Sequence, residues 1–226
     1  WLRKSSQLDH TVINAMLHEE SRPRTVNYPA GTSVFLRGLN LNPGQDPEDM
    51  VSIRLWMDQN RIITTRKRKL LSVADLRESI EQGVGPKTPV DFLARLNDRL
   101  TDRMSDVLDS IDDEVDRLEE EVITAESYLI RPKISDIRRQ SILIRRYLAP
   151  QREALSRLYN EQNSLISDEE RLHFREANDR IMRYIENLDS ARDRASITQE
   201  ELSSRLSEQM DKRMYILSVV AVIFLP

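Results

Sequence analysis

The alternation of apolar and polar side chains predicts a small β-sheet in the first part of the chain. Between Met50 and Met57 every second residue from Val51 onward is apolar, which is typical of a strand with one buried face. The next apolar run follows Asp58-Gln59-Asn60, which predicts a hairpin turn. Strands are therefore predicted at Val34–Leu39, Met50–Met57 and Arg61–Thr65, with Thr25–Tyr28 as a weaker fourth.

Helical spacing and end signals predict two short helices beside these strands. Apolar residues recur at helical intervals over Gln7–Glu19. A second short helix is predicted over Ser72–Gln82, capped by Ser72 and ended by Gly83. The segment Leu41–Asp49 contains two prolines and a glycine and is predicted to be a loop.

Beyond Thr88 the apolar residues keep spacings of three and four, which predicts a long amphipathic helix. Thr88 is the expected cap, and Pro89 takes the first helical position, where its missing amide hydrogen costs nothing. Pro132 is expected to end this helix, and a second long helix should run from about Lys133 to Asn163 with a kink at Pro150. The apolar stripe consists of Leu93, Leu96, Leu100, Met104, Val107, Ile111, Val115, Leu118 and Val122.

The last stretch, Ser167 to Pro226, predicts one very long helix. It contains no glycine and no proline before its final residue, and Ser167 with Glu170 has the spacing of a capping box. A helix of this extent would be on the order of 85 Å long. It closes with the apolar run Tyr215–Leu225, which is about half of the roughly 20 residues that a bilayer span requires. We therefore expect a soluble stalk that is cut off where it enters a membrane helix.

Composition supports a predominantly helical fold. Hydrophobic residues make up 39% of the 226 residues and charged residues 32%, which favours long solvated helices over a compact sandwich. The predicted fold is an α/β layered N-terminal domain over residues 1–86, a long helical hairpin over 87–166, a stalk helix over 167–214 and the start of a first transmembrane helix over 215–226. Because Trp1-Leu2 resembles the middle of an element, the start of the first domain is expected to be missing.

Charge and cysteine content exclude several classes of function. The net charge of −4 gives no general attraction to nucleic acid. The absence of cysteine excludes a disulfide framework and a thiolate-bound structural zinc. The sequence contains no nucleophile–base constellation and no glycine-rich phosphate loop. We therefore predict a protein that is not an enzyme, holds no tightly bound cofactor and has no nucleic-acid partner.

Two charged runs and one histidine segment are candidates for ion binding. Residues 109–121 include eight acidic side chains, which form either a cation-attracting surface or the solvated face of a helix. The basic run at residues 66–69 lacks interleaved aromatic residues and is interpreted as a solubility cluster rather than a phosphate or nucleic-acid patch. His18 and Glu19 could bind a divalent ion weakly, although the favoured interpretation is that they are surface side chains at a helix end.

The end of the last helix carries the most informative pattern. Asp211, Met214, Ser218, Ala221 and Leu225 follow at spacings of three and four and so share one face. If several such helices met around an axis, the carboxylates would form a ring that collects cations, and the apolar rings beyond it would form a constriction. The alternative is a coiled-coil seam that continues into a signalling or anchoring helix. Periodicity alone leaves both open.

The same region resembles a known family. Residues Lys212 to Pro226 look like the junction of the stalk helix and the first transmembrane helix in the CorA superfamily of divalent-metal transporters. Three further segments resemble its bacterial zinc-transporting ZntB branch rather than the magnesium branch; they are Ser21–Arg24, Met57–Leu71 and Arg145–Arg152. The family's Gly-x-Asn signature and second membrane helix would lie beyond Pro226, and its first strands before Trp1.

The resemblance implies the cytoplasmic part of a homopentameric funnel in the bacterial inner membrane, with zinc as the transported ion. Lys212 and Arg213, directly before the apolar run, favour the same cytoplasmic side. The implied pore face adds Leu217 to the five residues above, and Asp211 becomes a candidate metal ligand at the mouth. The rival hypotheses are a membrane-tethered coiled-coil scaffold or signalling stalk without transport, and, less favoured, a cytosolic metal-sensing module.

Overall fold

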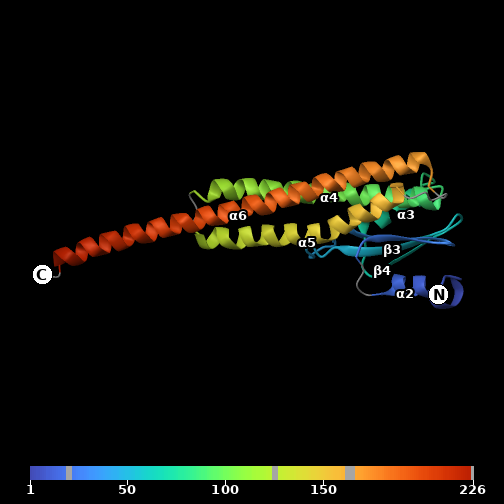
Figure 1. Cartoon of the computed structure of the whole chain (residues 1–226), viewed down its shortest axis with the longest axis horizontal. Coiled ribbons are helices and arrows are strands. Elements are labelled where there is room, and N and C mark those ends of the chain that lie inside the picture. Colours follow the sequence, from blue (N-terminus) through green and yellow to red (C-terminus); the bar gives the residue numbers. More distant parts are fainter. Residues whose placement is uncertain (19–21, 124–126, 161–165, 225–226) are drawn as a thin grey trace. The chain divides into compact units, whose positions relative to one another are not determined.

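The computed structural model describes residues 1–18, 22–123, 127–160 and 166–224. Within these ranges the chain is mostly helical and has one small antiparallel sheet (Figure 1), as the sequence predicts. The elements in chain order are α1 (Leu2–Ser5), α2 (His10–Leu17), β1 (Arg24–Tyr28), β2 (Gly31–Gly38), β3 (Val51–Met57), β4 (Ile62–Arg66), α3 (Leu71–Glu81), α4 (Pro89–Glu121), α5 (Ser127–Asn160) and α6 (Asp168–Phe224).

The chain divides into two compact units that do not follow chain order. Unit 1 comprises residues 1–108 and 143–186, and unit 2 comprises residues 109–142 and 187–226. The sheet and the short helices belong to unit 1, and the helices α4, α5 and α6 each contribute to both units. The predicted boundaries at 86, 166 and 214 separate successive segments of the chain rather than compact units, and they stay predictions.

The sheet of unit 1 is a simple meander. Its strands pair antiparallel in the order β1-β2-β3-β4, with Val34 opposite Leu55 and Leu55 opposite Thr64. The β3–β4 turn is closed by Asp58, whose Oδ1 accepts hydrogen bonds from the backbone N–H groups of Asn60 and Arg61, both at 3.0 Å. An aspartate that bonds the backbone two residues on is a local turn signal. All four predicted strands and the predicted hairpin turn are confirmed. The single buried face predicted for β3 is wrong, because Arg54 and Trp56 on one face are buried as well as Ile53 and Leu55 on the other.

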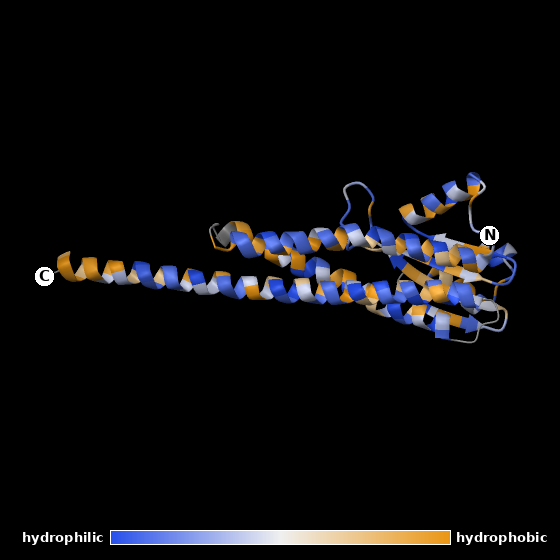
Figure 2. Cartoon of the chain, turned by 90° about the horizontal axis from the view of Figure 1, so that it is seen from above, coloured by the Kyte–Doolittle hydropathy of each residue, from blue (hydrophilic) through white to orange (hydrophobic). Residues whose placement is uncertain are grey.

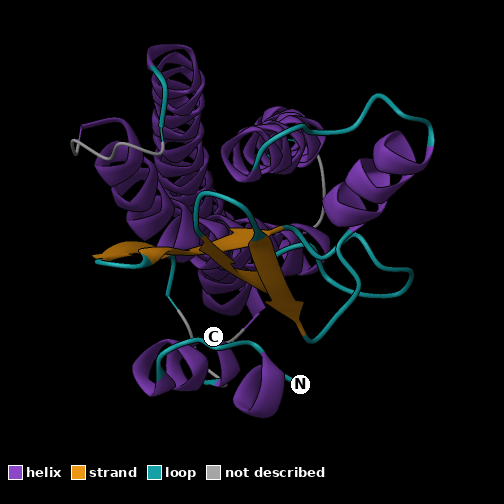
Figure 3. Ribbon diagram, turned by 90° about the vertical axis from the view of Figure 1, so that its right-hand side faces the viewer, coloured by secondary structure: helices purple, strands orange, loops and turns teal. Residues whose placement is uncertain are grey.

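The two faces of the sheet are covered differently (Figure 3). On one face, Val12 and Met16 of α2 pack on Phe35 and Trp56 in a buried cluster. On the other face lie the parts of the long helices that belong to unit 1. There the Thr25 hydroxyl donates to the carbonyl of Ala154 in α5 at 2.8 Å. Unit 1 is therefore layered, with short helices, sheet and long helices in succession.

Helix ends follow the local signals in most cases. The Thr88 hydroxyl accepts from the Asp91 N–H at 3.0 Å, so Thr88 caps α4 as predicted. At the start of α6, the Glu170 N–H donates to Ser167 Oγ at 3.3 Å and the Ser167 N–H donates to the Glu170 carboxylate at 2.9 Å, which is the predicted capping box.

The end of α3 is set by Gly83, which has a positive φ of 78°. The N–H of Gly83 donates to the Ile80 carbonyl and the N–H of Val84 donates to the Ser79 carbonyl, both at 3.0 Å. These two bonds form the Schellman arrangement that favours glycine after a helix, so the predicted end is confirmed. The predicted N-cap is wrong: α3 begins at Leu71, and Ser72 lies buried inside it.

Two other helix limits differ from the prediction. Helix α2 starts at His10 rather than Gln7 because Asp9 caps it, accepting from the Thr11 N–H at 2.7 Å. The predicted break at Pro132 is also wrong, because α5 already begins at Ser127 and contains this proline. A proline near a helix start removes only one backbone hydrogen bond, so neighbouring packing can override it. The kink expected at Pro150, also inside α5, stays a prediction.

The predicted apolar stripe of α4 is confirmed as the buried face of this helix. Eight of its nine residues are buried, from Leu93 in unit 1 to Val122, which directly follows α4 in unit 2. Val107 is only half-buried, and its neighbour Leu108 is buried in its place. A shift of the buried position by one residue is expected, because the 3.6 residues per turn of an α-helix do not match a strict seven-residue repeat.

Polar side chains flank this stripe where α4 and α6 meet in unit 1. Arg180 pairs with Asp102 at 2.6 Å, and the Tyr184 hydroxyl donates to the Thr101 carbonyl at 3.3 Å. Asp98, one turn before Asp102, is half-buried. Burial raises the pKa of Asp98 above its usual value of 3.8, while the nearby His173 acts in the opposite direction.

We expect Asp98→Asn to stabilise the protein at neutral pH. A carboxyl whose pKa is raised by folding binds more protons in the native state, so stability falls as pH rises from about 4 through the folded pKa, and the loss is complete above it. The variant removes this titration. Thermal unfolding between pH 3 and pH 8 should show a higher midpoint for the variant at neutral pH and a difference that shrinks in acid. A difference independent of pH would contradict the assignment.

Candidate functional site

The end of α6 exposes apolar side chains around the whole helix. Every residue from Glu208 to Val220 is exposed, and so are Val222, Ile223 and Phe224. This end of the helix is the strongly hydrophobic terminus in Figure 2. A helix that is apolar on all sides is normally buried, either in a protein core or in a membrane. Among the described residues, no helix has an apolar stretch long enough to cross a bilayer.

The predicted pore face lies within this exposed end. Met214 is 58% and Leu217 61% exposed, and Asp211 and Ser218 are exposed as well, whereas Ala221 is half-buried. At about 100° per residue, all of these lie within about 60° of Met214 around the helix axis. The Ser218 hydroxyl donates to the Met214 carbonyl at 2.8 Å, so it is bonded within its own helix. Leu225 lies outside the described residues.

Asp211 is the one acidic side chain on this face. Among the residues that the structure describes, it forms no ion pair, although Lys212 and Arg213 follow it directly and are exposed. An exposed carboxylate at the start of an apolar helix end is available to a cation or to another chain. The predicted role of Asp211 as a metal ligand requires several chains around a pore, so in this single chain it stays a prediction.

The second predicted metal position is at His18 and Glu19, and the described residues do not form a metal site there. His18 is exposed directly after α2, and its backbone carbonyl accepts a hydrogen bond from Nη2 of Arg54 at 2.6 Å. Glu19 lies outside the described residues. In the part of the chain that the structure covers, no three or more His, Asp or Glu side chains are grouped to hold a metal ion.

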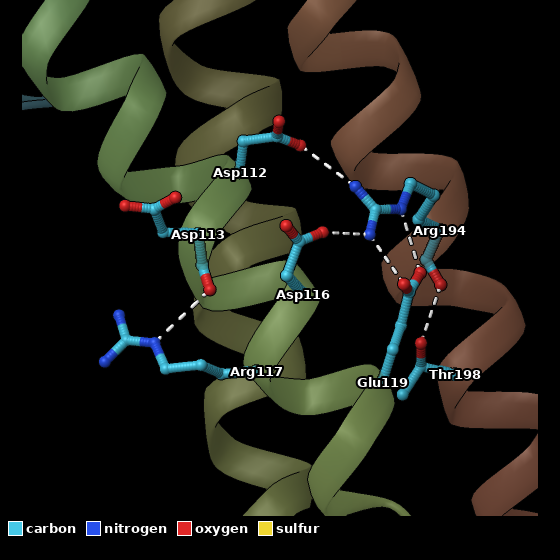
Figure 4. Close-up of polar contacts among 7 residues, drawn as sticks. All are labelled: Asp112, Asp113, Asp116, Arg117, Glu119, Arg194 and Thr198. Carbon is cyan, nitrogen blue, oxygen red and sulfur yellow. Dashed lines mark hydrogen bonds and ion pairs between the residues drawn. The ribbon is translucent and has the colours of Figure 1, made fainter.

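Three carboxylates of the acidic run of α4 contact an arginine of α6 in unit 2 (Figure 4). Asp112, Asp116 and Glu119 follow at spacings of four and three and so share one helix face. Arg194 donates to Asp112 at 3.0 Å and to the two carboxylate oxygens of Glu119 at 2.8 and 2.6 Å. It also pairs with Asp116. One guanidinium therefore serves three carboxylates, with a two-pronged bond to Glu119.

This cluster is held on both sides by its own helices. The Arg194 side chain is 29% exposed, and Thr198 Oγ1 donates to the Arg194 carbonyl one turn on at 2.9 Å. Hydrogen bonds to Glu119 and Asp116 raise the pKa of Arg194 further above its ordinary range. The arginine is therefore a permanent positive charge fixed among the carboxylates.

Other members of the acidic run also pair with cations of unit 2. Glu114 pairs with Arg117 at 2.7 Å and Glu121 with Lys133 at 3.0 Å. Five of the eight acidic side chains thus have named cationic partners. These pairs favour a role of the acidic run in holding the helices of unit 2 together over a role as a surface that collects free cations. The sequence offered one missed signal, because Arg194 is the cation on a face of α6 whose buried residues are uncharged; these are Leu188, Ala191, Ala195, Thr198 and Leu202.

A layered α/β unit continued by three long helices, the last ending in exposed apolar residues, is the fold of the funnel domains of metal-ion transporters. The family profile of the CorA-like Mg²⁺ transporter protein matches residues 1–226. The chain belongs to this CorA family, which is one of transporters.

Two individual relatives are similar in sequence to this chain over its whole length. It is 40% identical to the divalent cation transporter CmaX of Pseudomonas aeruginosa over 229 residues, covering 100% of this chain and 69% of CmaX. It is 33% identical to the zinc transport protein ZntB of Yersinia enterocolitica over 226 residues, covering 100% and 69%. The family and the resemblance to ZntB predicted from the sequence are confirmed.

Solved structures agree in fold. The structure of full-length CmaX superposes with a TM-score of 0.93, covering 100% of this chain and 70% of CmaX. The ZntB cytoplasmic domain of Vibrio parahaemolyticus superposes with a TM-score of 0.80 at 24% identity, covering 89% of this chain and 80% of that domain. The predicted fold class is therefore confirmed.

We expect Arg194→Met to destabilise unit 2 and to make its stability respond to divalent cations. Removing the guanidinium leaves three carboxylates facing one another, which should cost about 1 to 3 kcal/mol for a partly exposed cluster. Millimolar Mg²⁺ should then restore part of the lost unfolding temperature in the variant, while the unmodified protein should not respond.

Arg192→Met is the matched control. Arg192 pairs with Asp189 and Asp193 of its own helix at 3.5 and 2.9 Å, so its loss should cost no more than about 0.5 kcal/mol. Equal destabilisation by the two substitutions, or an Mg²⁺ response in the control, would show that the cluster has no special role.

Proposed function

We propose that this chain is the cytoplasmic funnel part of a zinc transporter of the ZntB type, which works as a homopentamer in the bacterial inner membrane. The observation that carries the proposal is the end of α6, where an exposed carboxylate at Asp211 precedes residues that are apolar on every side. Membership of the CorA family supports a transport role over the scaffold alternative.

The exposed apolar surface is the physical reason for assembly. Met214, Leu217 and Val222 lack cover within the described part of this chain, being 58%, 61% and 80% exposed. Apolar surface left in water costs about 25 cal/mol per Å², so the helix end should be covered by other copies, by lipid or by both. Lys212 and Arg213 before this end favour the cytoplasmic side for the rest of the chain.

In a pentamer each residue of the pore face would become a ring. The ring of Asp211 would attract hydrated divalent cations at the mouth, and the rings of Met214, Leu217 and Ala221 would form an apolar constriction that opens or closes with the packing of α6. A thioether is a soft ligand and could also contact a partly dehydrated zinc ion. Asp211 therefore selects for charge, and the residues beyond it control passage.

The identity of the ion is the finer part of the proposal. Two of the relatives named above differ in what their names specify, since CmaX is described as a divalent cation transporter and ZntB as a zinc transport protein. The residues of the pore face are carboxylate, thioether, hydroxyl and alkyl, and they contain no imidazole or thiolate. Selection for zinc would then depend on dehydration and pore width rather than on a strong fixed ligand set.

We expect Asp211→Asn to reduce zinc flux by about ten-fold, because a ring of five carboxylates would lose its charge. The measurement is uptake of zinc, and in parallel of magnesium and cobalt, into vesicles that contain the natural-length protein. Glu208→Gln is the matched control, because Glu208 lies about 60° further round the helix from Asp211 and away from the pore face. Unchanged flux in Asp211→Asn, or an equal loss in the control, would argue against this pore face.

We expect particles of five chains when the purified protein is measured by light scattering. Five times the chain mass of 26.4 kDa is the expected value, since stalks that converge on an axis need a closed ring. Replacing Met214 and Leu217 by Asn should weaken assembly, whereas replacing the exposed Ile142 of α5 by Asn should not. A stable dimer would contradict the proposal, because a pair of stalks encloses no pore.

A further inference from the structure

The C-terminal end of α4 carries charges of the unfavourable sign. Its last three residues, Glu119 to Glu121, are acidic, and no basic residue lies in its last turn. The backbone carbonyl groups at a helix C-terminus already carry partial negative charge, so carboxylates there destabilise the last turn. Arg194 of α6 pairs with Glu119, and Lys133 of α5 pairs with Glu121. This helix end is therefore stabilised by cations from the neighbouring helices of unit 2.

Arg205 of α6 adds a hydrogen bond to the same end. Its Nη1 donates to the backbone carbonyl of Ile123, two residues after α4, at 3.1 Å. Its Nε and Nη2 donate to one carboxylate oxygen of Glu201, one turn earlier in α6, at 3.2 and 3.0 Å. Basic side chains often bond the last carbonyl groups of their own helix, whereas this cation comes from a residue 82 positions away. Glu201 thus orients the guanidinium, and its remaining edge binds the end of α4.

Arg205 lies where α6 separates from the other helices of unit 2 (Figure 1). In the described part of the chain, Leu202 is the last buried residue of α6 and is 3% exposed. Arg205 and Leu206 are half-buried, and every residue from Ser207 to Val220 is exposed. Among the described residues, none of α6 beyond Arg205 forms a hydrogen bond to α4 or α5. Arg205 is therefore the last polar tie of α6 to these helices, about 9 Å before Asp211 at 1.5 Å per residue.

The direction of this tie agrees with the position of the pore face. At about 100° per residue, Arg205 lies about 180° from Met214 around the helix axis and at least about 120° from the other residues of the pore face. The end of α4 therefore contacts α6 from the side opposite to the pore face. A helix that is held from behind in this way can present its free face toward a central axis.

We propose that Arg205 is a positioning residue for the pore face, a role that rests on the transport function proposed for this chain. By binding the end of α4, Arg205 fixes the point at which α6 becomes free-standing, and with it the positions of Asp211 and Met214. Without this bond, the last described hydrogen bond from α6 to its neighbours would be that between Arg138 of α5 and Gln199, at 2.6 Å. The length of helix before Asp211 that no such bond supports would then rise from about 9 to about 18 Å.

A spin-label measurement tests the tie directly. The chain has no cysteine, so the substitutions Glu120→Cys and Gln209→Cys at two exposed positions allow selective labelling. Labelled chains of the natural-length protein are diluted with unlabelled ones, and double electron–electron resonance gives the distance between the two labels of one chain. We expect Arg205→Met to broaden the distance distribution. Arg205→Lys should restore part of it, because lysine keeps a charged donor but lacks the fork that also binds Glu201.

Cation uptake is the readout that a purely structural role would not change. In vesicles, Arg205→Met should lower the uptake of the transported cation by about five-fold or more, the low end of typical couplings between distant positions. Arg205→Lys should recover part of this loss. Arg192→Met is the matched control, because it removes the same charge from α6 at a cation that pairs with Asp189 and Asp193 of its own helix. The control should retain both the distance distribution and the uptake.

The outcomes that would overturn the proposal are distinct. An unchanged distance distribution in Arg205→Met would disprove the tie, and a broadened distribution with unchanged uptake would disprove the positioning role. Equal effects of Arg205→Met and Arg192→Met would show a general loss of charge. Uptake of zinc, magnesium and cobalt is followed in parallel, so a protein that carries magnesium but not zinc would refute zinc transport and still test Arg205. Uptake of none of these ions by the unmodified protein would refute the transport function on which the positioning role rests.

Discussion

Burial of one apolar stripe along α4 is the constraint on which the rest of the structure depends. The stripe runs from Leu93 in unit 1 to Val122 in unit 2. Most of the remaining positions of α4 are polar. Hydrophobic burial is not directional, so polar groups at the edges of the stripe must decide which helix faces it. Asp102 with Arg180 does this in unit 1, and Glu119 with Arg194 does it in unit 2.

Elements whose signals lie within a few residues could be predicted from the sequence. The period of two in β3, the Thr88 cap of α4 and the capping box of α6 are of this kind. The helix α5 shows the limit of such signals, because its start at Ser127 places Pro132 inside the helix. A local breaker predicts an end only when no tertiary contact compensates for the lost hydrogen bond.

Sites that combine distant segments could not be predicted in the same way. Arg194 lies 75 residues from Glu119, and sequence spacing contains no information on which faces of α4 and α6 meet. The bond from Arg205 to the Ile123 carbonyl likewise joins residues that lie 82 positions apart. The face from Asp211 to Ala221, in contrast, could be predicted from the helical spacing of its residues. Its proposed function requires several copies of the chain, which the structure of one chain does not show.

The pairing of the acidic run changes where a cation pathway should begin. The eight acidic residues at positions 109–121 would strongly attract metal ions if their charges were free. Arg194, Arg117 and Lys133 hold five of them, so much of that charge stabilises unit 2. Asp211 is also exposed, but it differs from these five because, within the described ranges, it has no ion pair. In the proposed pore, the charge that would attract a cation is thus separated along the chain from the charge that holds the helices together, and it lies where α6 becomes apolar.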